Sequence, residues 1–199
     1  MILPLSTAAN LYWLGRYLVR VDGLCHLLPF TDDIEAQTFA HAFSLPAWNA
    51  ETLNALIHDP NQAGSLPANL DAVKQNIQSV RGVLSAASFE AFHALCAHKQ
   101  PAFTDLTDML TSCRASLKHE SPMVQLFLNM GESLERIDIS LRMIKDPARD
   151  IRAFSEVLDL LPIGWQRLKE PIVLLNQRYD RIAFYDLSDR IQELFRKGV

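Results

Sequence analysis

The sequence predicts an all-α protein, a helical bundle of about eight or nine helices, and three observations support this fold class. Only 7 of the 199 residues are glycine, about half the usual share of roughly 7%, which leaves few residues for tight turns and hairpins. Apolar residues recur every three or four positions along most of the chain, which is the spacing of an amphipathic helix. No stretch of about four to eight residues alternates apolar and polar side chains between turn residues, as a half-exposed strand would.

Five helices are predicted in the first half of the chain, each bounded by a capping or breaking residue. The first follows a cap at Ser6 or Thr7 and ends before Pro29, and Asn49 and Ser65 are predicted to cap two later helices. The loop between those two helices is the Pro- and Gly-containing segment 59–64. The predicted helices after the first are 32–43, 49–58, 65–84 and 86–98.

The second half is predicted to begin with a helix over 105–118, followed by a long one over 123–145 that Ser121 and Pro122 introduce. A further helix should run from Pro147 to about Leu161. Pro162 should open the next, which Pro171 would kink or break. The last predicted helix covers 186–197.

The first helix and the helix over 123–145 share one apolar pattern. The apolar positions of the first recur 116 residues later in the second, and four identities fall in the same register: Gly15/Gly131, Leu18/Leu134, Arg20/Arg136 and Asp22/Asp138. We therefore expect one domain over residues 1–199 with a diverged internal repeat, in halves 1–100 and 101–199. A glycine inside a helix costs about 1 kcal/mol relative to alanine, so the two glycines predict close approach of another helix or a ligand.

Charge and cysteine usage limit the possible partners. The net charge of −4 gives no field that would attract nucleic acid or an anionic membrane, and no segment is apolar enough to span one. Three cysteines without close pairing, and no signal peptide, indicate a reducing cytoplasmic location. His93, Cys96, His98 and Cys113 lack the paired spacing of a zinc site, so we expect no metal. Without a phosphate loop or dinucleotide fingerprint, we also expect no cofactor.

The candidate site lies on the back of the first helix. Trp13, Arg16 and Arg20 follow one another at helical spacing opposite the apolar stripe, and Tyr12 borders them. Two guanidinium groups one turn apart could hold a carboxylate or phosphate, with Trp13 stacked on Arg16. The alternative is that both arginines are ion-paired surface residues and that Trp13 only packs.

The matching helix supplies acidic partners. Glu132, Glu135 and Arg136 lie on its equivalent face. If a pseudo-twofold axis relates the two helices, Glu132 or Glu135 could meet Arg16 or Arg20 in a buried ion network. Structural and catalytic uses of such a network both stay open.

These residues carry a resemblance to a known family. The segment Asn10–Arg20 resembles the opening motif of the bacterial alpha-E domain family, Asn76–Arg81 resembles part of its middle helix, and Gly131–Asp138 resembles its later motif. The chain is identified as a short, diverged member, matching over about residues 5–145. The resemblance adds Arg81 to the candidate ligand-binding residues, which are Tyr12, Trp13, Arg16, Arg20, Arg81, Glu132 and Arg136, beside Glu135 as the candidate catalytic residue.

Two departures from the family pattern affect this site. Val19 stands where the first motif has glutamate, and Glu132 stands where the second has arginine. Each copy has therefore lost one half of its signature. Arg16 and Arg20 of the first copy could still form one site with Glu135 and Arg136 of the second.

The resemblance implies a function by association. Genes for alpha-E domains commonly accompany those for ATP-grasp peptide ligases and transglutaminase-like proteases. The expectation is a helical accessory or binding component of a peptide- or amide-ligase system, holding a carboxylate-bearing peptide or a partner's loop. One alternative is an amide-processing enzyme with Glu135 as general base. Another is a non-catalytic scaffold that forms a homodimer.

Overall fold

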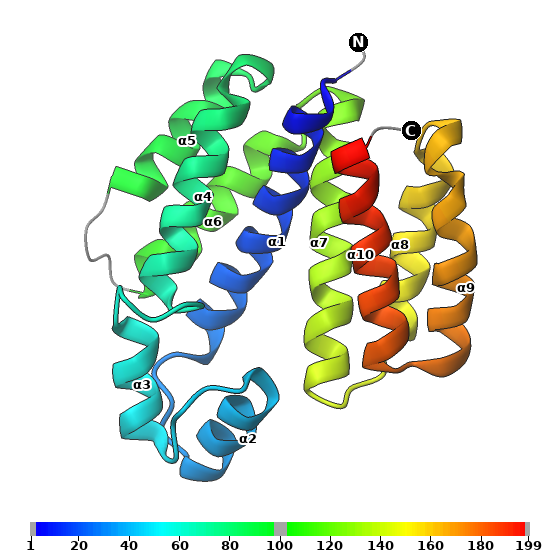
Figure 1. Ribbon diagram of the computed structural model, residues 1–199. Coiled ribbons are helices and arrows are strands. Elements are labelled where there is room, and N and C mark those ends of the chain that lie inside the picture. Colours follow the sequence, from blue (N-terminus) through cyan, green and yellow to red (C-terminus); the bar gives the residue numbers. More distant parts are fainter. Residues whose placement is uncertain (1–2, 98–102, 198–199) are drawn as a thin grey trace. The chain divides into compact units, whose positions relative to one another are not determined.

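The computed structural model describes residues 3–97 and 103–197, and in these ranges the chain forms ten α-helices, two short 3-10 helices and no strand (Figure 1). The all-α prediction is confirmed. The α-helices are α1 (Leu5–Leu27), α2 (Asp33–Phe43), α3 (Ala50–His58), α4 (Leu66–Val80), α5 (Ala86–Ala97), α6 (Phe103–Leu117), α7 (Pro122–Arg142), α8 (Ala148–Leu160), α9 (Lys169–Arg178) and α10 (Arg181–Lys197).

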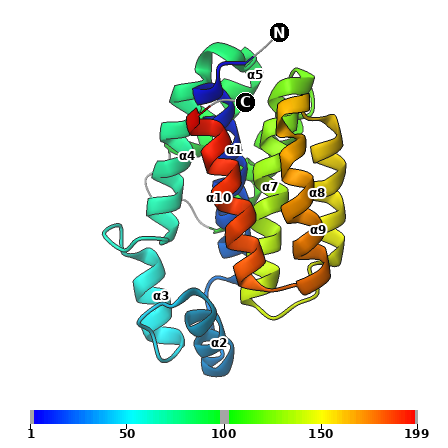
Figure 2. The same ribbon diagram turned by 45° about the vertical axis from the view of Figure 1, so that its right-hand side comes forward.

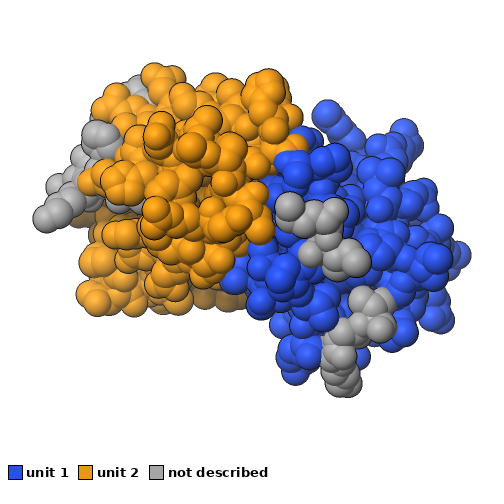
Figure 3. All heavy atoms as spheres, turned by 90° about the horizontal axis from the view of Figure 1, so that it is seen from above, with its two compact units in different colours: residues 1–16, 121–199 blue, residues 17–120 orange. Residues whose placement is uncertain are grey.

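The chain divides into two compact units, coloured separately in Figure 3. Unit 1 contains residues 1–16 and 121–199, and unit 2 contains residues 17–120. Helix α1 therefore contributes its first part to unit 1 and its remainder to unit 2. The internal repeat with halves 1–100 and 101–199, within a single domain, stays a prediction.

Unit 1 is built on four helices that run alternately up and down. Helix α8 packs against α7, α9 against α8, and α10 against both α9 and α7 (Figures 1 and 2). Aromatic side chains fill the space between them. Trp165 is 2% exposed, and its ring lies edge-on to Phe127 and Phe195, at centroid distances of 5.5 and 5.0 Å.

The C-terminal helices differ from the sequence prediction at two prolines and one cap. The segment after Pro162 forms a 3-10 helix, Ile163–Leu168, and Pro171 lies in the first turn of α9, where its missing N–H is not needed. The predicted kink at Pro171 is therefore wrong. Helix α10 begins at Arg181, five residues before the predicted start, because Oδ1 of Asp180 accepts a hydrogen bond from the backbone N–H of Ala183 at 2.8 Å.

Unit 2 confirms the predicted caps of two helices. Asn49 and Thr52 form a capping box at the start of α3, and the hydroxyl of Ser65 accepts from the N–H of Ala68 at the start of α4. Helix α4 packs against α5, and α5 against α6. Helix α4 ends at Val80, before a 3-10 turn over Arg81–Val83, so it is shorter than the predicted 65–84.

The start of α5 is held by a carboxylate from beyond the end of α6. Oε1 of Glu120 accepts hydrogen bonds from the backbone N–H of Ser85 at 2.9 Å and from its hydroxyl at 2.6 Å. Burial would raise the pKa of Glu120, but the hydrogen bonds from Ser85 and Ser88 outweigh it and lower that pKa. The carboxylate thus joins two helices of unit 2 and satisfies the backbone N–H of Ser85, the residue that precedes α5.

The helices that the structure describes are too short or too polar to span a membrane. In residues 3–97 and 103–197, no helix combines the length and the hydropathy needed to cross a bilayer.

Candidate functional site

The site in unit 1 rests on two glycines at which α1 and α7 approach each other closely. A Cβ atom added to Gly15 would overlap the carbonyl oxygen of Leu128, and one added to Gly131 would overlap that of Tyr12. These contacts are equivalent under the 116-residue offset, since Leu128 corresponds to Tyr12 and Gly131 to Gly15. The close helix approach predicted from the two glycines is confirmed.

Arg16 and Glu135 meet beside this contact. The Nε of Arg16 donates to Oε2 of Glu135 at 2.6 Å. Arg16 is 5% exposed and Glu135 is 2% exposed. The close backbones bring the two side chains together, so the ion pair joins α1 to α7 inside protein.

Asp138 extends the pair into a network. Its Oδ2 lies 3.7 Å from Nη2 of Arg16, and its Oδ1 accepts from Nε of Arg142 at 2.8 Å. Two carboxylates and two guanidinium groups therefore balance in charge. We call Arg16, Glu135, Asp138 and Arg142 the ion cluster. Among the described residues, every buried side-chain nitrogen and oxygen has a hydrogen-bond partner.

Two aromatic residues of α1 enclose the Arg16 guanidinium. The hydroxyl of Tyr12 accepts from Nη1 of Arg16 at 3.2 Å, and the Trp13 ring centroid lies 5.0 Å from the Arg16 Cζ. Tyr12 is fully buried and its ring lies 5.3 Å from that of Phe195. The expected stacking of Trp13 on Arg16 is therefore present.

The charge of Arg16 is strongly favoured despite its burial. Burial alone would lower the pKa of Arg16, but the interactions with Tyr12 and Glu135 outweigh that effect and raise the pKa. Arg16 is thus a cation at neutral pH. The carboxylate of Glu135 always faces this positive charge.

Glu132 and Arg136 form a further ion pair on α7. They pair with each other one turn apart on α7, with Arg136 Nη2 at 2.9 Å from Glu132 Oε2. The side chain of Arg136 is 43% exposed. The side chain of Glu132 is 14% exposed, so this pair is partly buried. The structure separates Glu135 and Arg136, neighbours in sequence, into one buried and one exposed charge.

The remaining two candidates belong to unit 2. The guanidinium of Arg20 lies over the ring of Tyr17, 5.2 Å from its centroid. Arg81 lies at the end of α4, with its guanidinium 4.9 Å from the centroid of Phe89. The expected network therefore forms with Arg16 and Glu135. Arg20 and Arg81 each lie over an aromatic ring in unit 2.

Sequence reasoning did not include Asp138 and Arg142 among the site residues. The signal was partly present, because Asp138 is one of the four identities between the two matching helices. Arg142 follows Asp138 at the i, i+4 spacing that favours an ion pair on a helix. Their part in the cluster depends on the position of Arg16, which only the fold supplies.

Within residues 3–97 and 103–197, no group of three or more His, Cys, Asp or Glu residues is placed to hold a metal ion. Of the residues considered for zinc, His98 and the side chain of Cys96 lie outside what the structure describes.

The ion cluster is arranged to hold helices together. A general base must come within hydrogen-bond distance of a substrate, and Glu135 instead accepts from a buried arginine. Removing one partner of such a pair leaves an uncompensated charge in the interior, which is costly. Neither Arg16 nor Glu135 can therefore be removed without destabilising the packing of α1 on α7.

Comparison with known proteins places this arrangement in a family. No curated protein and no solved structure significantly matches the chain. A family model does match over residues 3–166, more than half of the chain, and it describes Alpha-E, a predicted alpha-helical domain with a conserved ER motif. The dipeptide Glu-Arg occurs once in the chain, at Glu135-Arg136, where Glu135 enters the ion cluster. The chain belongs to the Alpha-E family.

Proposed function

We propose that this Alpha-E domain is a non-catalytic helical component of a bacterial peptide- or amide-forming system, in which it holds a carboxylate-bearing peptide or a loop of its partner. One observation carries the proposal. The guanidinium of Arg16 already has two internal carboxylates, Glu135 and Asp138, as its partners. An arginine engaged in this way supports the shape of a binding module, and recognition falls to the module's exposed side chains.

The partner we propose is an ATP-grasp ligase or a transglutaminase-like protein. The support for this choice is the resemblance of the motifs around Arg16 and Glu135 to a family whose genes accompany those enzymes. A helical component without a phosphate-binding loop would complement a ligase that binds ATP itself. It would supply a surface for the acceptor or the product.

Calorimetry tests the proposal. The chain is titrated with an ATP-grasp ligase or a transglutaminase-like protein from the same genome, at about 0.1 mM, where a complex of micromolar affinity is readily measured. We expect binding by the wild type and by a folded Arg16→Met/Glu135→Leu double variant, because the cluster supports the fold and does not touch the partner. Absence of binding by the wild type would contradict the proposal.

The same double variant separates this proposal from a ligand site at the cluster. If the double variant keeps the circular dichroism spectrum of the wild type but loses the partner, Arg16 and Glu135 recognise the partner directly. The alternative role of Glu135 as general base is tested with Glu135→Gln on amide substrates. Turnover by the wild type that this substitution abolishes would establish an enzyme.

A further inference from the structure

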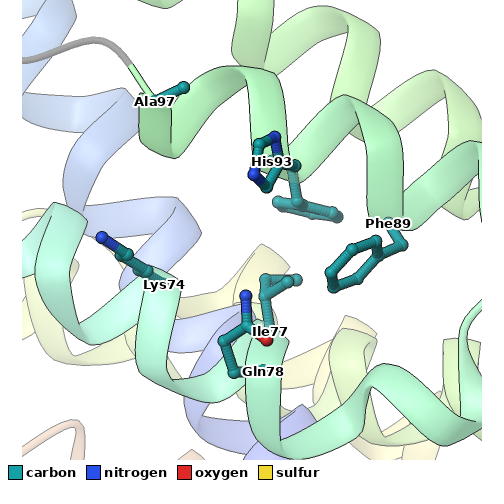
Figure 4. Close-up of a pocket in the computed structure, with 7 residues that line it drawn as sticks. Lys74, Ile77, Gln78, Phe89, His93 and Ala97 are labelled. Atoms are coloured by element: carbon teal, nitrogen blue, oxygen red, sulfur yellow. The ribbon is translucent and has the colours of Figure 1, made fainter.

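A pocket in unit 2 has the character of a binding site that the motifs do not include. It opens between α4 and α5 and has a volume of about 110 Å³ (Figure 4). It is lined by Lys74, Ile77, Gln78, Phe89, Phe92, His93 and Ala97.

One side of the pocket is apolar. Ile77 and Phe92 are 2% and 0% exposed, so the pocket reaches the core of unit 2. The ring of Phe89 stands at one edge (Figure 4). This side offers apolar surface to a hydrophobic group and holds no polar atom that such a group would leave unpaired.

The other side of the pocket is lined by side chains that contain nitrogen. In Figure 4 the nitrogen-bearing ends of Lys74, Gln78 and His93 lie to the left of Phe89, and His93 is one turn after Phe89 on α5, with ring centroids 6.4 Å apart. They present an ammonium, a carboxamide and an imidazole, all able to donate hydrogen bonds. None of the lining residues is acidic. The polar side is therefore suited to an anion with several acceptor atoms.

The apolar wall is held in place from outside the pocket. The Arg81 guanidinium stacks on Phe89 at 4.9 Å from the ring centroid, and Glu120 anchors the first turn of α5 through Ser85. A wall fixed before binding loses little entropy when a ligand enters. Arg81, a candidate ligand-binding residue by resemblance, thus acts on the pocket through Phe89.

We propose that this pocket binds the carboxyl-terminal residue of a peptide, or a free N-acyl amino acid of the same chemistry, with a branched aliphatic side chain. The side chain enters between Ile77 and Phe89, and the carboxylate faces Lys74 and His93. The size follows from the volume, since a cavity of about 150 Å³ holds benzene and this one is smaller. The assignment rests on the proposed function, because it names the site for the carboxylate-bearing ligand.

The experiment is a titration of the isotope-labelled full chain with N-acetylleucine, followed by the backbone amide signals of α4 and α5. We expect saturable shifts at Ile77, Phe89 and His93. N-acetylleucinamide, which lacks the charge, should bind about three- to fivefold more weakly, as should N-acetylleucine to Lys74→Gln. N-acetyltryptophan should not bind, because its side chain exceeds the volume.

Two substitutions on the exposed face of α4 form a matched pair. Gln78→Trp should fill the pocket and abolish the shifts, whereas Gln75→Trp, outside the pocket, should leave them unchanged. Equal binding of acid and amide, or binding by Gln78→Trp, would overturn the assignment.

A longer peptide ending in leucine distinguishes the two sources of the ligand. Binding at least tenfold tighter than N-acetylleucine identifies a peptide terminus, and equal binding identifies the small molecule. If N-acetylleucine binds as described but no ligase or peptide does, the pocket stands and the proposed function fails. If the partner protein binds and N-acetylleucine does not, the proposed function stands and the assignment of the pocket fails.

Discussion

Arg16 on α1 and Glu135 on α7, separated by 119 residues in sequence, form a buried ion pair with 2.6 Å between Nε and Oε2. The pair lies beside a contact at which neither Gly15 nor Gly131 could accept a methyl group. Close helix packing and internal charge pairing thus occur together at one crossing, and both can be tested by substitution.

Arg16→Ala or Glu135→Ala should each lower the free energy of unfolding by about 3–5 kcal/mol, because each leaves the other charge buried without its partner. Urea unfolding followed by circular dichroism measures the loss. The Arg16→Met/Glu135→Leu double variant should lose less than either single variant, since no charge remains unpaired. As a control, Arg136→Ala removes a half-exposed arginine and should cost less than about 1 kcal/mol. Equal losses for Arg16→Ala and Arg136→Ala would refute the buried-pair account.

Gly131→Ala should destabilise the protein by about 2–3 kcal/mol, because the new methyl group would overlap the carbonyl oxygen of Tyr12. That oxygen belongs to the backbone of a helix, so it cannot move aside as a flexible side chain could. Gly23→Ala is the matched control, since it lies in α1 with no atom within 4 Å of its added Cβ. That substitution should raise stability by about 0.5–1 kcal/mol through helix propensity. In thermal unfolding, the melting temperature should therefore fall for Gly131→Ala and rise for Gly23→Ala.

The sequence predicted most helix limits because they depend on local features. Asn49 and Ser65 cap helices through hydrogen bonds to residues three positions away, which a reader of the sequence can identify. Asp180 caps α10 in the same local way, but the predicted helix began later, at Asp186. The pairing of Arg16 with Glu135 was expected only as one of several combinations. The choice among them depends on the helix crossing, which involves residues more than a hundred positions apart.

Glu120→Gln should reduce stability at pH 7 by about 1 kcal/mol and change its pH dependence. The pKa of Glu120 is lowered by the hydrogen bonds from Ser85 and Ser88, so its ionised form stabilises the folded state. That contribution is fully present above the ordinary value of 4.5 and is lost as the pH falls through the lowered pKa of the folded state. Unfolding free energies of wild type and variant should therefore converge below pH 4.5. If the difference in unfolding free energy between wild type and variant stays constant from pH 7 to pH 3, the charge of Glu120 does not contribute to stability.

Cys25 should resist alkylation in the folded protein. Burial, with a smaller effect from Asp22, raises the pKa of the Cys25 thiol to about 11, so little thiolate exists at pH 8. Peptide mapping after iodoacetamide treatment should find Cys25 unmodified in native protein and modified in urea. Cys113 is fully buried and should behave in the same way. Rapid native labelling of Cys25 would contradict the packing of α1.

Ile144→Gly should raise the melting temperature. Ile144 follows α7 with φ of 54°, a left-handed conformation that a β-branched residue adopts at a cost of about 1–2 kcal/mol. Its side chain is 95% exposed, so glycine would sacrifice almost no packing. Ile182→Gly, in the first turn of α10 and 72% exposed, should lower the melting temperature, because glycine is a poor helix former and Ile182 has no left-handed backbone for it to relieve. A lower melting temperature for both variants would mean that Ile144 makes stabilising contacts.

Unit 1 is discontinuous, because residues 17–120 lie between its first helical turns and the rest of its chain. A fragment that starts at Ser121 would keep Glu135 and Asp138 but lose their shared cation, Arg16. Such a fragment should fold poorly alone and recover when a synthetic peptide covering the first part of α1 is supplied in trans. The same topology implies that a ribosome must release α7 before the earliest residues of the chain acquire their native partners.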